Sequence, residues 1–231
     1  MSSDIQIPAN IFQTWQTHKL PLQMFNAIKT IKRQNPRFNY YLFSDSDCRL
    51  FISKNFEPAV LNAYDRLIPG AYKADLWRYC ILYKYGGIYL DIKYVPDNNF
   101  KFVNLLTKEY FVLDQDNDGI YNAFMVCKAG NEILLKAINQ IVENVKNNFY
   151  GNSFLEPTGP KLLSKYFSNA EKQALDMRHG LRSSGTEDSK KYISYNGMDV
   201  LKCYSGYHNE RIKYSEKKHY SELWNKRNVY L

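Results

Sequence analysis

The residues in this chain best suited to chemistry are two carboxylates and one guanidinium that lie close together in the sequence. Asp75 and Arg78 are three positions apart in a segment with a helical pattern, so they share one face of the predicted helix. The pair Gly86-Gly87 then ends the helix, because glycine adopts positive φ angles at little cost. A short apolar strand follows, and its last residue, Asp91, emerges at the carboxyl edge of the sheet, where open α/β sheets bind ligands. This group suits a ligand with hydroxyls, phosphates or a bound cation.

The same residues allow a plainer interpretation that needs no ligand. Asp75 and Arg78 would then form an ion pair on the protein surface, and Asp91 would cap a turn. Both interpretations stay open at this point. The length of the continuous pattern around the three residues favours the binding site.

The elements that must position these residues alternate between strand and helix. Ser44 supplies N-cap chemistry for a short helix, and Pro69-Gly70 breaks the chain just before the helix that carries Asp75. This alternation predicts an α/β protein with a Rossmann-like half-domain. The predicted strands cover 7–15, 38–43 and 88–91, and the predicted helices cover 21–34, 56–66 and 71–85.

The second half of the chain has fewer clear patterns. Thr158-Gly159-Pro160 is typical of a turn before a helix. The sequence of 231 residues contains no linker, low-complexity tract or repeat, so we expect one domain over 1–231. The predicted elements here are strands over 109–114 and 120–127 and a helix from Gly130 or Asn131 to about Asn147.

Several cofactor classes are not supported by the sequence. No GxGxxG motif follows the first predicted strand, which argues against NAD and flavin. The four cysteines are widely spaced without a CxxC pair, so zinc, haem attachment and a disulfide framework are not indicated. His18, His179 and His208 show no ligand spacing and receive no role.

The formal charge of +8 leaves two interpretations open. The lysines and arginines are dispersed rather than gathered into a stripe, which disfavours nucleic-acid binding. They form either an ordinary solvated surface or a basic face for a phosphorylated or lipid-diphosphate acceptor at a membrane. No stretch approaches the roughly 18 apolar residues of a transmembrane helix, so a soluble, cytoplasmic protein is expected. Peripheral contact with a membrane surface is compatible with this expectation.

The run 73–93 resembles the sugar-binding region of glycosyltransferase family 32, a resemblance that extends to the large glucosylating toxins. The family pattern is roughly R-x-A/S-D-x-x-R-Y-x-x-L-Y-x-x-G-G-x-Y-x-D-x-D. One position departs from it, because Lys93 stands in place of the second acidic residue. The residues that meet the pattern are Lys73, Ala74, Asp75, Arg78, Tyr79, Leu82, Tyr83, Gly86, Gly87, Tyr89 and Asp91.

The resemblance implies an α/β protein with the GT-A glycosyltransferase fold, a single Rossmann-like nucleotide-sugar-binding domain with a mixed central sheet. The implied reaction moves a hexose from a UDP- or GDP-sugar to an acceptor hydroxyl with retention of anomeric configuration. The acceptor would be a glycan, a lipid-linked group or a protein, phosphorylated acceptors included. Synthesis of a surface or capsule-type glycan is the expected setting.

The resemblance also assigns roles to individual residues. Asp91 would bind ribose or sugar hydroxyls, Asp75 would accept hydrogen bonds from sugar hydroxyls, and Arg78 would offset charge near the phosphates. Trp15 would stack on the nucleotide base, or else belong to the core. Asp91 and His219 would hold a divalent cation, with Mn²⁺ expected. The implied donor-binding residues are Trp15, Gln13, Tyr79, Gly87, Lys93, Asn122, Ser221 and Trp224.

Lys93 leaves the chemistry open, because a protonated lysine cannot ligate a metal. Its ammonium group would replace the cation, or it would turn outward while Asp91 still holds a metal. In a third interpretation the site is degenerate, and the chain only binds a sugar nucleotide or glycan. The tail 219–224 has two interpretations as well, since it would close over the diphosphate or simply pack on the domain.

Overall fold

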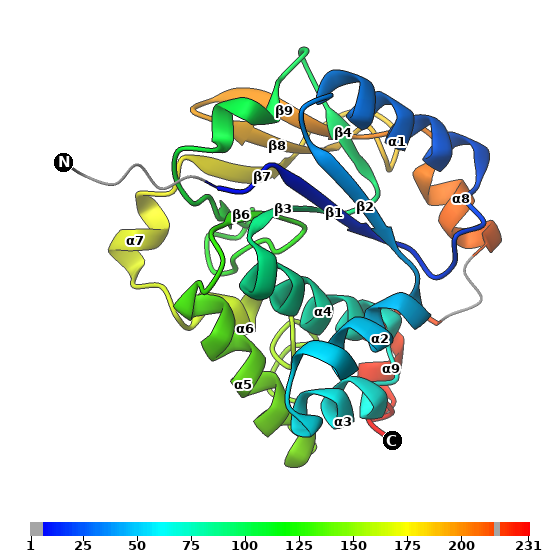
Figure 1. The fold of residues 1–231 in the computed structure, drawn as a ribbon, viewed down its shortest axis with the longest axis vertical. Helices are drawn as coiled ribbons and strands as arrows, with labels where there is room; N and C mark the ends of the chain where they lie inside the picture. Colours follow the sequence, from blue (N-terminus) through cyan, green and yellow to red (C-terminus); the bar gives the residue numbers. More distant parts are fainter. Residues whose placement is uncertain (1–6, 215–217) are drawn as a thin grey trace.

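The computed structural model describes residues 7–214 and 218–231, and it is built on two β-sheets (Figure 1). The first sheet has the strand order β2-β1-β3-β6 and is mixed. Strand β1 pairs in parallel with both β2 and β3, whereas β3 and β6 are antiparallel. The strands are β1 (Asn10–Thr14), β2 (Asn39–Phe43), β3 (Gly87–Leu90) and β6 (Phe124–Cys127).

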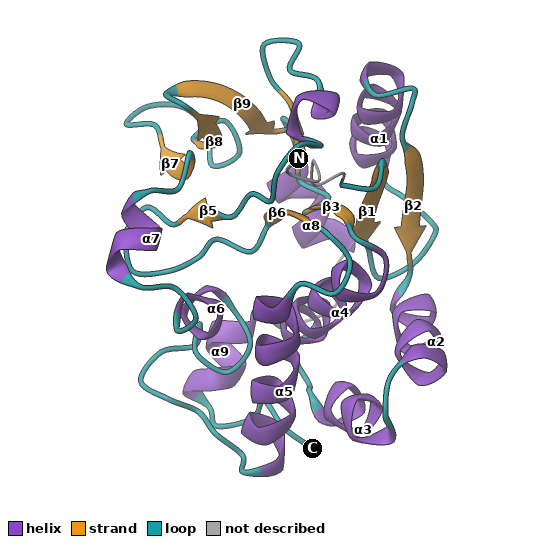
Figure 2. Ribbon diagram, turned by 60° about the vertical axis from the view of Figure 1, so that its left-hand side comes forward, coloured by secondary structure: helices purple, strands orange, loops and turns teal. Residues whose placement is uncertain are grey.

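The second sheet has the order β4-β9-β8-β7-β5. Only β5 and β7 pair in parallel, and the other neighbours are antiparallel. Figure 2 shows this sheet beside the first one. Its strands are β4 (Tyr94–Pro96), β5 (Val112–Leu113), β7 (Met177–Leu181), β8 (Lys191–Tyr195) and β9 (Met198–Cys203).

Helices cover the first sheet, and side-chain caps fix where some of them begin. Ser44 and Asp47 form a reciprocal capping box at the start of α2, and the Asn131 side chain accepts from the N–H of Leu134 at the start of α5. The helices are α1 (Leu22–Gln34), α2 (Asp45–Asn55), α3 (Pro58–Arg66), α4 (Gly70–Tyr85), η1 (Phe102–Leu105), α5 (Glu132–Lys146), α6 (Pro160–Ser164), α7 (Asn169–Gln173), α8 (Tyr207–Tyr214) and α9 (Tyr220–Asn225).

The first sheet separates two hydrophobic cores, because successive side chains of a strand point to opposite faces. Phe12 and Tyr89 are neighbours in register and face the helices α2 to α6. Ile11 and Ile88 are the adjacent pair and face α1 and the second sheet. Alternation along β1 and β3 therefore fixes which layer lies on each side of the sheet.

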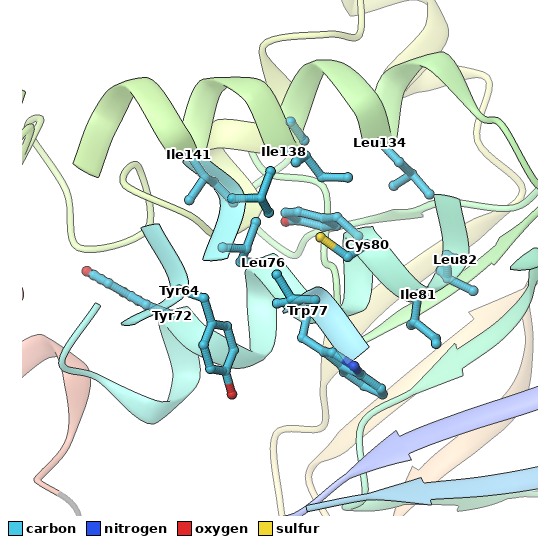
Figure 3. Packing of buried hydrophobic residues seen from close by; sticks show 14 of the residues in the cluster. Tyr64, Tyr72, Leu76, Trp77, Cys80, Ile81, Leu82, Leu134, Ile138 and Ile141 are labelled. Carbon is cyan, nitrogen blue, oxygen red and sulfur yellow. The ribbon is translucent and has the colours of Figure 1, made fainter. Parts of the chain in front are cut away.

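Helix α4 lies between the sheet and α5 and is buried over most of its length (Figure 3). Leu76 and Cys80 pack toward Ile138 and Ile141 of α5, while Trp77 points to the other side, against Phe43 and Tyr89. Polar residues on the buried part of such a helix must be paired, because burial removes most of their contact with water. This requirement applies to Asp75 and Arg78.

Replacing Ile138 tests this packing. Ile138 is almost fully buried in the α4–α5 contact, so Ile138→Ala should lower the free energy of unfolding by about 2–5 kcal/mol. The control is Asn139→Ala, an exposed position on the same helix, which should change it by less than about 0.5 kcal/mol. Urea unfolding followed by circular dichroism measures both. Equal effects of the two changes would contradict the described core.

The first half of the chain agrees with its sequence patterns. Helix α4 ends at Tyr85 and is capped by Gly86, whose φ is 64° and whose added Cβ would lie 2.6 Å from the Ala129 nitrogen. The strand predicted over 109–114 is wrong in length, because only the two residues of β5 form a ladder. The strand predicted over 120–127 likewise begins at Phe124. Strands β7, β8 and β9 have no counterpart among the predictions.

In the described residues, no helix combines the length and the apolar composition needed to cross a bilayer.

Candidate active site

A cavity of about 600 Å³ opens where the carboxyl ends of β1 and β3 meet α4 and the second sheet. It receives side chains from α4, α8 and the segments that follow β1, β3 and β5. Seven of the residues predicted from the sequence line it: Trp15, Asp75, Arg78, Asp91, Lys93, Asn122 and His219. The predicted site is therefore assembled at one place by four separate parts of the chain.

Asp75 is 7% exposed, and every contact of its carboxylate is made inside the protein. Its Oδ1 accepts from Asn122 Nδ2 at 2.9 Å, and its Oδ2 accepts from Thr158 Oγ1 at 2.7 Å. Burial raises the pKa of the Asp75 carboxyl despite the opposing effect of Arg78. The interpretation of Asp75 and Arg78 as a surface ion pair is thus wrong.

Arg78 is the cation at the centre of the site and is 6% exposed. Its Nη2 lies 3.4 Å from Asp75 Oδ1, and its Nη1 lies 3.2 Å from Asp91 Oδ1. The guanidinium carbon is 4.4 Å from the centre of the Tyr89 ring. Nη1 also donates to the Asn122 carbonyl at 2.8 Å. One planar group therefore links the two carboxylates and orients both.

Asp91 follows β3 directly and joins Arg78 to Lys93. Tyr89 donates its hydroxyl to Asp91 Oδ1 at 2.7 Å, and Lys93 Nζ donates to Asp91 Oδ2 at 2.8 Å. Burial alone would raise the pKa of Asp91, but Lys93 and Arg78 outweigh it and hold this pKa below its ordinary value. Burial opposes the charge of Lys93 too, yet Asp91 keeps the pKa of Lys93 well above its ordinary value.

Lys93 points into the site rather than outward. Its Nζ lies 5.2 Å from the centre of the Tyr94 ring and 5.4 Å from that of the Tyr121 ring. Only 17% of its side chain is exposed. The position that departs from the family pattern thus adds a fixed positive charge beside Asp91, which meets the pattern. Asp75, Arg78, Asp91 and Lys93 together form what we call the charge chain.

Two residues predicted to bind the donor lie behind the cavity wall instead. Gln13 is fully buried, donates to the Asp91 carbonyl at 3.3 Å and accepts from the Tyr40 hydroxyl at 2.7 Å. Tyr79 donates to the Thr158 carbonyl at 3.1 Å. Neither side chain lines the cavity, because both point from their elements into the core. They brace the charge chain.

Gly87 lies at the opposite end of β3 from Asp91. A Cβ at this position would fall 2.8 Å from the Asn10 carbonyl oxygen, so glycine is required for the close approach of β1 and β3. Gly87 does not line the cavity. The structure gives Gly87 a role in strand packing, and its donor contact stays a prediction.

The C-terminal segment agrees only in part with its prediction. Its residues His219 and Tyr220 line the cavity. Ser221 and Trp224 do not line the cavity. The hydroxyl of Ser221 lies 2.7 Å from His219 Nδ1, and Trp224 Nε1 donates to the Tyr150 carbonyl at 2.8 Å. Helix α9 therefore packs on the protein and presents its N-terminal end to the cavity.

Trp15 lines the cavity just after β1. Its indole Nε1 is buried and has no hydrogen-bond partner among the described residues. An indole N–H of this kind usually has a partner, so a ligand group or a water is expected to supply one. The placement of Trp15 is compatible with its predicted contact to the nucleotide.

The sequence missed three residues of the site: Thr158, Asp114 and His179. Thr158 was predicted only as part of a turn before a helix, but its hydroxyl donates to the Asp75 carboxylate. His179 Nδ1 lies 2.8 Å from Asp114 Oδ1 in the same cavity. No local pattern signals the second pair, because its members are 65 positions apart and meet through the second sheet.

The donor groups do not fit a divalent cation held by Asp91. Both of its carboxylate oxygens already contact Tyr89, Arg78 and Lys93, and two of these partners are cations. A metal at Asp91 would have to displace Lys93. His219, the second predicted ligand, directs Nδ1 to Ser221. Across the described residues, no group of three or more His, Cys, Asp or Glu side chains is placed to hold a metal.

Residues 21–113 match the family described as "Glycosyltransferase sugar-binding region containing DXD motif". The matched segment ends just before Asp114 and contains the whole charge chain. The segment belongs to this family. The DXD motif itself is represented here by Asp91 and Lys93.

Relatives of this DXD glycosyltransferase segment include fungal mannosyltransferases. Inositol phosphoceramide mannosyltransferase 3 of Schizosaccharomyces pombe is 34% identical over 163 residues, which are 70% of this chain and 45% of that protein. The initiation-specific alpha-1,6-mannosyltransferase of Candida albicans is 34% identical over 91 residues, which are 37% of this chain and 24% of that protein. The chain spans about half or less of the length of these curated relatives.

Among solved structures, the PaToxG glycosyltransferase superposes with a TM-score of 0.56 at 17% sequence identity. The superposition covers 69% of this chain and 67% of PaToxG. The chain therefore has the GT-A glycosyltransferase fold, as the family resemblance implied. Strands β2 and β3 of the mixed four-stranded sheet lie within residues 21–113, and the charge chain lies at the carboxyl edge of this sheet.

Proposed function

We propose that this protein is a glycosyltransferase that moves a hexose from a nucleoside diphosphate sugar to an acceptor hydroxyl. The observation that carries the proposal is the charge chain, in which two carboxyl groups and two cations line a cavity of about 600 Å³, Asp75 and Arg78 buried and Asp91 and Lys93 mostly buried. Buried charges of this kind are expensive for folding and are concentrated at functional sites. Membership of residues 21–113 in the DXD family supports the same conclusion.

Each member of the charge chain fits one requirement of the reaction. Cleavage of the anomeric C–O bond moves negative charge onto the departing diphosphate. Lys93 and Arg78 offset that charge, and they do so in a site where the fold has already fixed their positions. Asp75 and Asp91 accept hydrogen bonds from sugar hydroxyls, and Trp15 packs against the base.

The positive charge at the diphosphate comes from the chain itself in this proposal. Lys93 stands where the family pattern has a metal-ligating acid, and its Nζ is held 2.8 Å from Asp91. A lysine fixed in this way acts as a point charge toward phosphate oxygens. We therefore assign to Lys93 the task that Mn²⁺ would otherwise perform. We expect the acceptor to attack from the side of the leaving diphosphate, with retention of configuration.

Mannose is the first candidate for the transferred hexose, and an inositol phosphate lipid is the first candidate acceptor. Both follow from the name of the relative that is an inositol phosphoceramide mannosyltransferase. The formal charge of +8 suits an acceptor with a phosphorylated head group at a membrane surface. A cytoplasmic location stays a prediction.

Nucleotide titration is the experiment that tests the proposal. The purified protein is titrated calorimetrically with UDP and with GDP, each with Mn²⁺ and with EDTA. Turnover of GDP-mannose and of UDP-glucose is then measured with and without myo-inositol 1-phosphate as the acceptor. We expect one nucleotide to bind in EDTA and the matching donor to be consumed. Failure of both nucleotides to bind would overturn the proposal.

A protein that binds a sugar nucleotide without turnover is the second candidate. Lys93 favours it, because this lysine occupies the second acidic position of the motif. The same experiment separates the two functions, since this candidate requires saturable binding without transfer or hydrolysis under any metal.

A further inference from the structure

The cavity contains a second pair of ionisable side chains, which the charge chain does not use. His179 Nδ1 lies 2.8 Å from Asp114 Oδ1, and the side chains are 8% and 13% exposed. The parallel pairing of β5 with β7 brings them together, because Leu113 is opposite Arg178 and the next positions are 114 and 179. Both side chains line the cavity. We call this pair the His179–Asp114 dyad.

The chemistry of the His179–Asp114 dyad follows from the state of the carboxyl group. Burial alone would raise the pKa of Asp114, but the hydrogen bonds from His179 and from the Gln115 N–H outweigh it and hold this pKa below its ordinary value. An ionised Asp114 accepts the Nδ1–H of His179. The lone pair of the imidazole is then on Nε2, as in other dyads in which a carboxylate fixes the tautomer.

The Nε2 atom of His179 has no structural task. It is buried and has no hydrogen-bond partner within the described residues. An unpaired buried nitrogen costs free energy, and in native proteins such an atom calls for a specific explanation. A group that enters the cavity and donates a proton to Nε2 would satisfy it.

The dyad lies next to the charge chain. The rings of His179 and Tyr121 are stacked with centres 3.8 Å apart and an angle of 4°. Lys93 Nζ lies 5.4 Å from the centre of the same Tyr121 ring. One aromatic ring therefore contacts both His179 and the lysine assigned to the diphosphate. Tyr121 is itself held by a 2.9 Å hydrogen bond between its hydroxyl and that of Tyr94.

We propose that the His179–Asp114 dyad binds the acceptor and accepts the proton of its attacking hydroxyl. This inference rests on the proposed function. The hydroxyl oxygen forms a bond to the anomeric carbon while the bond from that carbon to the diphosphate oxygen breaks. The electron pair of the broken bond leaves with the diphosphate, and the hydroxyl proton passes to Nε2 of His179. Asp114 stabilises the imidazolium that results.

The placement of the dyad agrees with attack from the side of the leaving group. Since His179 and Lys93 both contact the Tyr121 ring, a hydroxyl at Nε2 would lie close to the lysine assigned to the diphosphate. The other cavity histidines lack this arrangement. In the described part of the chain, His208 and His219 have no carboxylate within ion-pair distance.

His179→Ala and His179→Gln test the proposal. We expect transfer to the acceptor to fall about 100-fold or more in both variants, as for loss of a general base. The dissociation constant of the nucleotide should change less than twofold, since the charge chain is intact. Added imidazole should restore part of the rate in His179→Ala only. A structural role would not produce this rescue.

The matched control is His18→Ala. His18 Nε2 lies 2.6 Å from Asp47 Oδ2, so it forms the same kind of pair, but on the exposed surface outside the cavity. Transfer by this variant should equal that of the unchanged protein. Transfer within threefold of normal in both His179 variants, or an equal loss of nucleotide binding and transfer, would overturn the proposal.

A second measurement tests the His179–Asp114 dyad independently of the proposed function. Protein labelled with ¹⁵N in its histidines is titrated with myo-inositol 1-phosphate in the presence of GDP or UDP. We expect the Nε2 resonance of His179 to shift while those of His18 do not. This shift is independent of turnover, so it supports the dyad even if no donor is consumed. A nucleotide-bound protein whose His179 resonances do not respond would count against the dyad alone.

Discussion

Asp91→Asn should reduce sugar transfer about 1,000-fold or more. Asp91 contacts both cations of the charge chain, at 3.2 Å from Arg78 Nη1 and 2.8 Å from Lys93 Nζ. A neutral amide removes the charge that orients these cations. Its N–H group also cannot accept a hydrogen bond from Arg78 or Lys93, which are donors only. Initial rates with saturating donor and acceptor measure the change. Nucleotide binding should weaken as well, because Lys93 and Arg78 lose their fixed positions.

The same substitution should also destabilise the protein, because it leaves two mostly buried cations without their shared partner. The melting temperature of the Asp91→Asn variant is therefore measured together with its rate of sugar transfer. Asp65→Asn is the control, since Asp65 pairs with Arg49 at 2.7 Å on the exposed surface, where an ion pair contributes little to stability. If Asp91→Asn stays folded and keeps its transfer rate within tenfold, the site has been assigned to the wrong residues.

Lys93→Asp should convert the site into one that depends on Mn²⁺. The new carboxylate would stand beside Asp91, and two adjacent carboxylates repel each other unless a cation lies between them. In EDTA we expect the variant to lose nucleotide binding, and with Mn²⁺ we expect the binding to return. The unchanged protein should bind equally in EDTA and in Mn²⁺. Calorimetric titration under the two conditions measures both proteins.

Lys93→Met separates the charge of the lysine from its bulk. Methionine keeps most of the side-chain volume and supplies neither a cation nor a carboxylate, so binding should be weak with and without Mn²⁺. The assignment of Lys93 to the diphosphate fails if the unchanged protein loses nucleotide binding in EDTA and regains it with Mn²⁺. In that case the metal is held in spite of the lysine.

The charge chain could be predicted from the sequence because its geometry is local. Asp75 and Arg78 are one helical turn apart, and the glycine pair and a four-residue strand lead to Asp91. These spacings determine which face and which sheet edge carry the side chains. Local spacing could not predict where the side chains of Gln13 and Tyr79 point, because both reach into the core to partners far along the sequence.

The second sheet shows why the remainder of the site was missed. Strand β5 has two residues and β4 has three, so neither presents a period that a sequence pattern can reveal. His179 depends on this sheet, since its partner Asp114 is brought close only by the pairing of β5 with β7. The pairing of such short strands is decided by packing, which places Val112 and Met177 in the same core.

The link between Lys93 and Asp91 changes what the cell must supply to this protein. A metal ion is an exchangeable solute, and its occupancy at a site rises and falls with the free concentration around it. A lysine is encoded in the gene and is present at full occupancy in every folded molecule. Since the ammonium of Lys93 is 2.8 Å from the carboxylate before any donor arrives, sugar transfer here is expected to continue when manganese is scarce. Manganese limitation would therefore distinguish this protein from relatives that keep both acids of the motif.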